Sequence, residues 1–277
     1  MMNLSTSAYY YQPKVDPVER SKREADLIDR LDAIHAEFPR CGYRMMKQYL
    51  KRAGVIVSAR RLRRLMKQHG LQALIKRAYV TTTDSNHKLP VYPNLIAGLA
   101  VTGINQVWVA DITYIRILTG FVYLAVILDV YSRRIVGWAI STRIDGELTI
   151  KALNDAIEKR NPTRGTFHHT DRGVQYAYGE YVKILEQRGF HISMSAKGNP
   201  YDNAFAESLM KTLKYDEIYL WNYETWNDVM DRLPNFIEEV YNKKRLHSGI
   251  GYLPPEEFEK LLEGKSDNDA SRPLLTL

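Results

Sequence analysis

The sequence contains one cysteine, Cys41, among its 277 residues. A single cysteine cannot form a disulfide within the chain and excludes zinc sites built from several cysteines, so this usage suits a reducing compartment. Long apolar runs are also missing, because the longest clean one covers only residues 121–128, far short of the roughly 20 residues that span a bilayer. The first residues lack the basic start and apolar core of a signal peptide. The sequence therefore predicts a cytoplasmic protein without a membrane partner.

Acidic residues are scarce in the first third of the chain. Residues 1–100 hold 18 Lys and Arg against 8 Asp and Glu, whereas residues 101–277 hold 21 Lys and Arg against 24 Asp and Glu. The formal net charge of +7 and the sequence pI of about 9.2 therefore originate in the N-terminal third. A basic segment of this kind indicates a polyanionic partner, with nucleic acid as the first candidate. The uneven charge predicts two parts with different electrostatic roles.

Residues 21–77 are predicted to form a helical module. Apolar residues recur at helical spacing within residues 21–38, a second helix is expected to stop at Gly54, and Ser58 is a suitable N-cap for a third helix that ends at Gly70. The third helix is strongly basic and carries Arg60, Arg61, Arg63, Arg64 and Lys67. Three short helices with a basic last one predict a helix-turn-helix-like DNA-binding module. The alternative is an ordinary solvated cationic face, because such a pattern alone is weakly specific.

The rest of the chain is divided by changes of pattern into an N-terminal segment (1–20), a Thr- and Pro-containing linker (78–105), a core (106–222), a helical extension (223–264) and an end expected to be disordered (265–277). The core is predicted to contain strands at 106–117, 121–130, 134–142, 165–171 and 191–196, with helices at 146–160, at 179–188 and from Asn203. This order predicts an α/β fold, a mixed sheet with helices on its faces, and matches the ribonuclease-H-like fold.

Three acidic residues stand where such a sheet can build a polar site. Asp111 interrupts an apolar strand, where a charge is costly unless it is paired or binds a metal. Asp171 ends a strand, the position at which open α/β sheets place their sites. Glu207 lies on a helix whose polar side would also carry Lys211 and Lys214. Acids gathered in this way could hold two divalent ions about 4 Å apart for phosphoryl transfer.

Each acid also has an ordinary structural explanation. Asp111 could bond to neighbouring backbone or to an arginine, Asp171 could shape a turn, and Glu207 could belong to a solvated face of Glu–Lys pairs. Asp129 and Asp202 compete for the same role, and spacing alone excludes neither. The residues by themselves therefore leave these alternatives open.

Motifs in several parts of the chain resemble those of one known family. Similarity to the catalytic core of retroviral-integrase-like transposases is carried by WVADITYI, HTDRGVQY and SMSAKGNPYDNAFAESLMKTLK. The family's C-terminal signature and N-terminal helical module are matched by YNKKRLHSGIGYLPPEEF and by GYRMMKQYLKRAG with VSARRLRRLMKQHGL. On these motifs the chain is identified as a member of the IS3 family of insertion sequences, as its B-frame protein (OrfB). The 35 residues between Asp171 and Glu207, and Lys214 seven positions after Glu207, match this superfamily.

The resemblance implies that Asp111, Asp171 and Glu207 are the catalytic, metal-binding triad of a DDE transposase. It implies Mg²⁺, with Mn²⁺ as a substitute and two ions expected. The reaction would be cleavage at an insertion-sequence end, which frees a 3′-hydroxyl that attacks another phosphodiester. Asp129 would then belong to the family motif DVYSR, outside the triad. The residues expected near DNA in the core are Lys197, Asn199, Tyr201, Asn203, Lys211 and Lys214.

The resemblance also implies partners: the terminal inverted repeats, target DNA and the A-frame product, joined to this chain as a frameshift fusion that works as a multimer on DNA at the bacterial nucleoid. The sequence departs from the family's pattern at residues 97–100 and at Leu246, where relatives usually have proline. Two alternative functions are a non-catalytic DNA-binding regulator and a simple nuclease of the ribonuclease-H type. The intact triad argues against the first, and the basic N-terminal third argues against the second.

Overall fold

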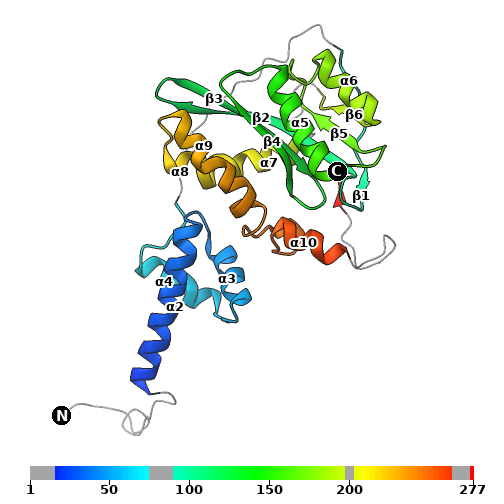
Figure 1. Ribbon diagram of the computed structural model, residues 1–277. Helices are drawn as coiled ribbons and strands as arrows, with labels where there is room; N and C mark the ends of the chain where they lie inside the picture. The colour runs from blue at the N-terminus through cyan, green and yellow to red at the C-terminus, as the bar shows by residue number, and fades with distance from the viewer. Residues whose placement is uncertain (1–15, 75–89, 197–202, 264–274) are drawn as a thin grey trace, which may run out of the picture. The chain divides into compact units, whose positions relative to one another are not determined.

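The computed structural model describes residues 16–74, 90–196, 203–263 and 275–277. The chain divides into two units, Met1–Ile75 and Lys76–Leu277, which are drawn in Figure 1 and described one at a time below. None of the helices in the described ranges is both long and apolar enough to span a bilayer.

The first unit is a group of three helices, α2 (Pro17–Glu37), α3 (Tyr43–Arg52) and α4 (Ala59–Gln68). Helix α2 begins earlier than predicted because Asp16 caps it, accepting from the Val18 amide at 2.9 Å, and Pro17 suits the first helical position. The predicted N-cap Ser58 is confirmed, since its hydroxyl accepts from the Arg61 amide at 3.3 Å. Residues from all three helices form one core, with Leu31, Met46, Leu50, Leu62 and Leu65 fully buried.

The second unit is built on a five-stranded mixed sheet. Its strands are β2 (Val107–Ile117), β3 (Gly120–Asp129), β4 (Ile135–Ser141), β5 (Phe167–Thr170) and β6 (His191–Met194), in the spatial order β4-β3-β2-β5-β6. The first three strands form an antiparallel meander, and β5 and β6 are added parallel to β2. This is the order of the ribonuclease-H-like fold, so the predicted fold class is confirmed.

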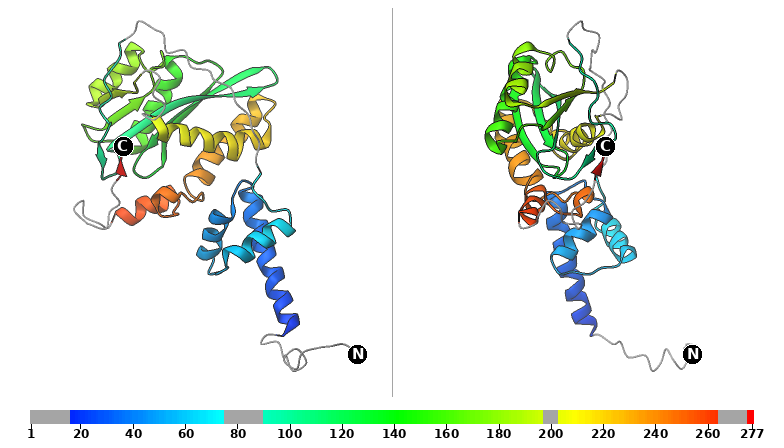
Figure 2. Two further views of the ribbon diagram at one scale, coloured as in Figure 1. Left: turned by 180° about the vertical axis from the view of Figure 1, so that it is seen from behind. Right: turned by 90° about the vertical axis from the view of Figure 1, so that its right-hand side faces the viewer.

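Helices cover both faces of this sheet, as the side view in Figure 2 shows. One face packs against α5 (Gly146–Arg160) and α6 (Gly179–Arg188), and the other packs against α7 (Ala204–Leu213) and α9 (Trp226–Asn235). Asp145 caps the N-terminus of α5 and accepts from the Leu148 amide at 3.1 Å. Gly137 of β4 lets α5 approach closely, because a Cβ there would lie 2.4 Å from the Ala152 carbonyl oxygen.

The C-terminal region after α7 consists of short helical pieces: a π-helical turn (Lys214–Ile218), α8 (Tyr219–Trp221), α9, a second π-helical turn (Phe236–Tyr241), a 3₁₀ turn (Ser248–Ile250) and α10 (Pro255–Leu262). The sequence predicts a helical extension at 223–264, and the structure divides it into these separate pieces. Pro234 lies inside α9 and has no amide hydrogen to donate, so the helix widens directly after it.

A second, two-stranded sheet pairs β1 (Ala100–Val101) with β7 (Leu275–Thr276). The sequence predicts a linker for the first segment and disorder for the second, and the structure contains a two-residue strand in each of them. Strands of two residues are too short to produce an alternating pattern that sequence reading can detect. The remainder of the predicted disordered end, residues 265–274, lies outside the described residues.

Candidate active site

Strand register places two of the three predicted acids side by side. Strands β2 and β5 are parallel, and their last aligned pair is Ala110 with Thr170. The next residue on each strand is an aspartate, Asp111 on β2 and Asp171 directly after β5. Neighbouring strands lie about 4.8 Å apart, and residues in register point to the same face. The two carboxylates therefore meet at the edge where β5 ends.

The face on which these aspartates lie is the one covered by α7. Val107, Val109 and Ile115 of β2 belong to the same buried cluster as Leu209 and Leu213 of α7. Side chains alternate along a strand, so Asp111 shares this face with them. The site therefore lies between the sheet edge and the helix that carries Glu207.

Asp111 is held in a setting that disfavours its charge. The pKa of its carboxyl is raised to about 7, first by burial, then by the nearby charge of Asp171 and to a smaller extent by that of Glu207. Opposing effects come from the Ile112 amide, which donates to Asp111 Oδ1 at 2.8 Å, and from the positive charge of Lys214. Burial and the neighbouring like charge both disfavour the ionised form of this carboxylate. A bound cation would therefore stabilise it.

The surroundings of Asp171 add another polar group. The Gly173 amide donates to Asp171 Oδ1 at 2.9 Å and shapes the turn after β5. The Tyr176 hydroxyl is buried without a hydrogen-bond partner among the described residues. Burial raises the pKa of Tyr176 well above its usual value, and the charges of Asp111 and Asp171 act in the same direction. The site therefore holds two carboxylates and an unsatisfied hydroxyl, a polar group that usually requires a partner.

Glu207 is on the predicted side of α7 but is turned to solvent. Leu209 and Leu213 are buried, as predicted, while the Glu207 side chain is 55% exposed and lies 3.8 Å from Lys211 Nζ. This is the Glu–Lys pairing of the ordinary structural explanation. As the side chains stand, no group of three acidic, histidine or cysteine residues within the described ranges could hold a metal ion. The fold thus brings the three acids to one region, but the Glu207 side chain is paired with Lys211 instead of joining Asp111 and Asp171.

The loop before α7 carries several predicted DNA contacts. Lys197, Asn199 and Tyr201, together with the competing Asp202, lie outside the described residues. Asn203 occupies the N-cap position of α7, where its Oδ1 is buried without a hydrogen-bond partner among the residues that the structure describes. Lys214 at the other end of the helix is half-buried, and burial lowers its pKa while the charge of Asp111 opposes that change. Of Lys211 and Lys214, the predicted basic contacts in the core that the structure describes, Lys214 is the one electrostatically coupled to Asp111.

His169 is a site residue that the sequence analysis did not predict. It is fully buried two residues before Asp171, with its Nδ1 2.8 Å from Ser193 Oγ and its Nε2 3.1 Å from Ser195 Oγ. Arg172 Nε also donates to the Ser195 carbonyl at 2.8 Å. These contacts join β5 to the end of β6 and so fix the strand end that carries Asp171. His169 is assigned to the site by the register of β5 and β6, and this register cannot be read from the sequence alone.

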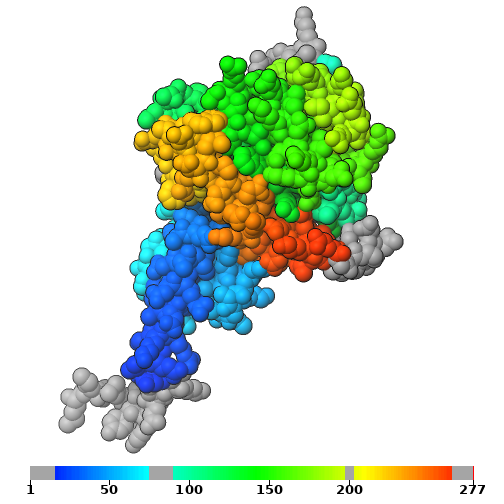
Figure 3. Space-filling view, viewed as in Figure 1, coloured from blue at the N-terminus to red at the C-terminus, as the bar shows by residue number. Residues whose placement is uncertain are grey.

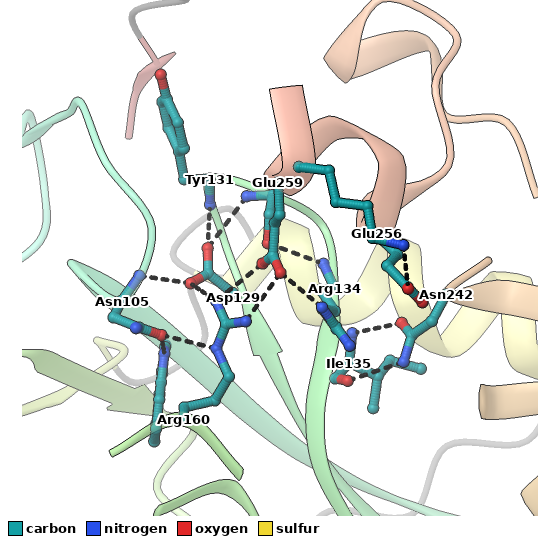
Figure 4. Close-up of polar contacts among 12 residues, drawn as sticks. Asn105, Asp129, Tyr131, Arg134, Ile135, Arg160, Asn242, Glu256 and Glu259 are labelled. Carbon is teal, nitrogen blue, oxygen red and sulfur yellow. Dashed lines mark hydrogen bonds and ion pairs between the residues drawn. The ribbon is translucent and has the colours of Figure 1, made fainter. Parts of the chain in front are cut away.

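Asp129 has a different role, which Figure 4 shows. It is fully buried and accepts from the amides of Asn105 (2.6 Å), Tyr131 (2.9 Å) and Ser132 (3.1 Å). Arg160 of α5 lies 3.8 Å from Asp129 and binds both oxygens of Glu259 at 2.8 Å. Oδ1 of Asp129 thus serves the turn of the DVYSR motif, and Oδ2 binds Asn105 and lies beside Arg160. These contacts give Asp129 a structural role outside the candidate site.

The same network fastens the C-terminal region to the core. Glu259 of α10 binds Arg134 at 2.7 Å, and Asn242 pairs through its amide group with both backbone groups of Ile135, each at 3.0 Å. In this way Asn242 satisfies the free edge of β4. In the space-filling view α5, α9 and α10 form one continuous surface (Figure 3). These contacts of Asn242 and Glu259 hold the C-terminal region against the sheet, and we call them the C-terminal clasp.

The basic helix α4 of the first unit presents a stripe of cations. Its buried side carries Leu62, Leu65 and Met66, whereas the side chains on the opposite side are exposed: Arg60, Arg63, Arg64 and Lys67. Arg61 donates to Glu24 at 3.0 Å, and Arg63 lies over the Tyr43 ring at 5.1 Å. Within the described ranges Arg60 and Lys67 have no ion-pair or hydrogen-bond partner. Two of the five predicted basic contacts are thus open to an external anion.

Family models match most of the chain. The Integrase core domain model matches residues 102–200, a second Integrase core domain model matches residues 188–255, and the HTH-like domain model matches residues 22–79. A 31 kDa protein of insertion element IS600 from Shigella sonnei is 39% identical over 262 residues, which is 94% of this chain and 96% of that protein. The transposase for insertion sequence element IS904 from Lactococcus lactis is 38% identical over 251 residues, 90% of this chain and 98% of the relative. The transposase InsF for insertion sequence IS3A of Escherichia coli is 38% identical over 195 residues, 70% of this chain and 68% of the relative. The chain belongs to the IS3 family of insertion-sequence transposases.

The likeness to solved structures is weaker than the likeness to these relatives. Among solved structures, the catalytic core domain of BIV integrase is 17% identical with a TM-score of 0.44, over 57% of this chain and 96% of that one. The HTLV-2 integrase catalytic core domain in complex with magnesium is 16% identical with a TM-score of 0.43, over 60% of this chain and 98% of that one.

The raised pKa of Asp111 makes the stability of this IS3-family transposase depend on pH when no metal is present. Between pH 4 and 7 the unfolded chain releases a proton from Asp111, whose ordinary pKa is 3.8, while the folded chain with a pKa of about 7 retains it. Ionisation of this group therefore destabilises the fold increasingly up to pH 7. We expect Asp111→Asn to raise the melting temperature in EDTA at pH 8, with a gain that fades towards pH 5.

Thermal melts in EDTA at several pH values measure this effect, and Asp231→Asn, an exposed acid on α9, is the matched control. An Asp111→Asn protein that melts at or below the wild-type temperature at pH 8 would show that the Asp111 charge is not destabilising.

Proposed function

We propose that this transposase cuts DNA at insertion-sequence ends and joins the freed 3′-hydroxyl to another strand, using divalent cations held by Asp111, Asp171 and Glu207. The observation that carries the proposal is the register of β2 and β5, which sets Asp111 and Asp171 next to each other on the face covered by α7. Carboxylate oxygens are the donors that Mg²⁺ prefers, and Mn²⁺ accepts the same set. The residues therefore fit a two-ion site.

When bound, such ions supply activation of the attacking oxygen and stabilisation of the leaving oxygen. The chain's own residues prepare this arrangement. Asp111 and Asp171 provide oxygens from two adjacent strands, and His169 with Ser193 and Ser195 fixes the strand end. Glu207 has to exchange its contact with Lys211 for the aspartates, and Lys211 is then released to bind a DNA phosphate. Lys214 neutralises charge beside Asp111.

Product analysis on a labelled insertion-sequence end tests this function. We expect cut and joined strands in the presence of Mg²⁺ and neither product in EDTA. Cut strands without joined product would indicate a simple nuclease. DNA binding without either product would indicate a regulator.

We also propose a division of labour along the chain, in which residues 21–77 bind DNA, residues 106–222 carry the chemistry and residues 223–264 brace the core. The exposed cations of α4 and the clasp around Glu259 support this division. The DNA bound would be the terminal inverted repeats and the target.

The salt dependence of DNA binding should identify the cations that contact phosphates. Each phosphate contact that is lost lowers the slope of log affinity against log salt by about 1. We expect the double variant Arg60→Ala, Lys67→Ala to lower this slope by about 2, because neither side chain is engaged within the protein. Arg61→Ala is the control, since Arg61 is bound to Glu24, and should lower the slope less. Equal slopes for the double variant and the wild type, in anisotropy titrations, would exclude α4 from the DNA interface.

A fusion with the A-frame product, made by ribosomal frameshifting, is proposed as the form that recognises element ends. Support comes from the family membership and from the need to hold two ends together, which also favours a multimer on DNA. This chain alone should then bind terminal repeats only slightly better than unrelated DNA. Tight, end-specific binding by this chain in a competition assay would contradict the proposal.

A further inference from the structure

The hairpin of β2 and β3 extends past the rest of the sheet, and Figure 1 and Figure 2 show it projecting. Strand β5 pairs with β2 only as far as Ala110, and β4 pairs with β3 only from Tyr123 onward. Among the residues that the structure describes, β2 therefore has a strand neighbour on one side only from Asp111 to Ile117. The hairpin projection begins at the candidate active site itself.

Aromatic side chains gather along this free edge. Tyr114 of β2 and Phe121 of β3 meet edge-to-face with ring centroids 5.6 Å apart, and Tyr215 and Tyr219 meet in the same manner at 5.3 Å. Tyr219 also interacts electrostatically with both Tyr114 and Tyr215, so the two pairs are neighbours. Phe121 is 46% exposed. We call these four residues the aromatic patch.

Cations accompany the aromatic patch. Lys214 Nζ lies over the Tyr114 ring at 5.1 Å, and its charge also acts on Asp111. Arg116 is exposed and stands opposite Phe121 in the hairpin. Lys214 thus connects the patch to the candidate active site. Tyr114 lies three residues from Asp111, about 10 Å along the strand, and its side chain leaves β2 on the opposite face, so a DNA strand at Asp111 would reach the ring around the free edge of β2.

We propose that the aromatic patch stacks an unpaired base of the DNA strand beside the phosphate that reacts. Aromatic rings interleaved with cations are suited to single-stranded nucleic acid, because rings stack on any base and cations follow the backbone. Stacking offsets the cost of unpairing a base at the cleavage position. A docked apolar protein segment fits the two cations less well. This inference rests on the proposed function, since it takes Asp111 to mark the reacting phosphate.

The test uses the full chain carrying Asp171→Asn, so that no cleavage changes the DNA during binding. The probe is a duplex with a forked end in which 2-aminopurine replaces one unpaired base, compared with a blunt duplex of the same sequence. Stacking on the patch should quench the fluorescence. We expect Tyr114→Leu and Phe121→Leu each to remove the quenching and to weaken forked-DNA binding about tenfold, with blunt-duplex affinity unchanged.

Leu118→Ala is the matched control, because Leu118 stands at the same hairpin turn, is 77% exposed and has no ring. It should behave like the parent protein. Phe121→Leu removes a half-exposed ring, and its melting temperature shows whether this variant keeps its fold. It tests the aromatic patch even if Tyr114→Leu fails to fold. Unchanged quenching and unchanged forked-DNA affinity in Phe121→Leu would overturn the inference. So would unchanged fork binding together with altered self-association in sedimentation, which would mark a protein interface.

Failure of this inference can be told apart from failure of the proposed function. Strand joining by a protein without the Asp171 substitution reports the proposed function alone. Metal-dependent joining with no fork preference would remove only the role of the aromatic patch. Fork preference that depends on the patch, without any joining, would remove the proposed chemistry and leave a DNA-binding surface.

Discussion

Asp171→Asn is expected to lose cleavage and joining by a factor of about a thousand or more while DNA affinity stays similar or increases. In the proposed site this carboxylate is one of the metal ligands, and several kcal/mol of transition-state stabilisation would depend on the ions that it helps to hold. An asparagine side chain has a similar shape, so the turn made by the Gly173 amide on Oδ1 can persist. Removing one negative charge also lowers repulsion of the DNA.

The measurement is a time course of cut and joined strands in Mg²⁺, with DNA affinity measured on the same preparation. Asp231→Asn changes an exposed acid of the same type on α9 and should retain wild-type activity. Joining retained in Asp171→Asn would refute its assignment as a metal ligand. A parallel loss of DNA affinity would instead point to a disrupted fold.

Arg160→Met is expected to give the largest loss of stability, about 3–5 kcal/mol in the free energy of unfolding. Arg160 is mostly buried and binds both oxygens of Glu259, with Asp129 3.8 Å away. Its removal leaves two buried carboxylates short of a counter-charge, which is the costly way to break a buried ion pair. The core and the C-terminal clasp should be weakened together.

Urea denaturation followed by circular dichroism measures this loss, and the adjacent Lys159→Met is the control. Lys159 is 42% exposed and contacts Asp155 and Glu238, each at 2.9 Å. Exposed pairs contribute little, so this change should cost less than about 1 kcal/mol. Equal losses of unfolding free energy for the two variants would show that the contacts of Arg160 with Glu259 and Asp129 do not hold the C-terminal region.

Local features of the fold could be predicted because the chemistry that sets them is local. Asp145 and Ser58 cap helices as short polar residues do, and the helices at 146–160 and 179–188 have the predicted bounds. Apolar residues that alternate with polar ones or follow one another in short runs predicted the strands and their order along the chain. Pro234 and the two-residue strands lie beyond such patterns, because their effects depend on what the chain meets in space.

The candidate site could be predicted in part, and the limit is the register of the sheet. Asp111, Asp129 and Asp171 are alike in sequence context, and spacing alone could not separate them. Pairing of β2 with β5 brings Asp111 and Asp171 together, while Arg160 and three backbone amides occupy Asp129. The role of His169 could not be predicted, because the pairing of β5 with β6 is what brings Ser193 and Ser195 beside it.

Strand rejoining on a branched DNA oligonucleotide in Mn²⁺ tests the central claim most directly, because this reversal of strand transfer needs little recognition of an element end. The account predicts that the wild type forms rejoined product only when Mn²⁺ is present, and that Asp171→Asn forms none while binding the same DNA. Rejoined product from Asp171→Asn, or from the wild type in EDTA, would contradict a metal-dependent centre built on Asp111, Asp171 and Glu207.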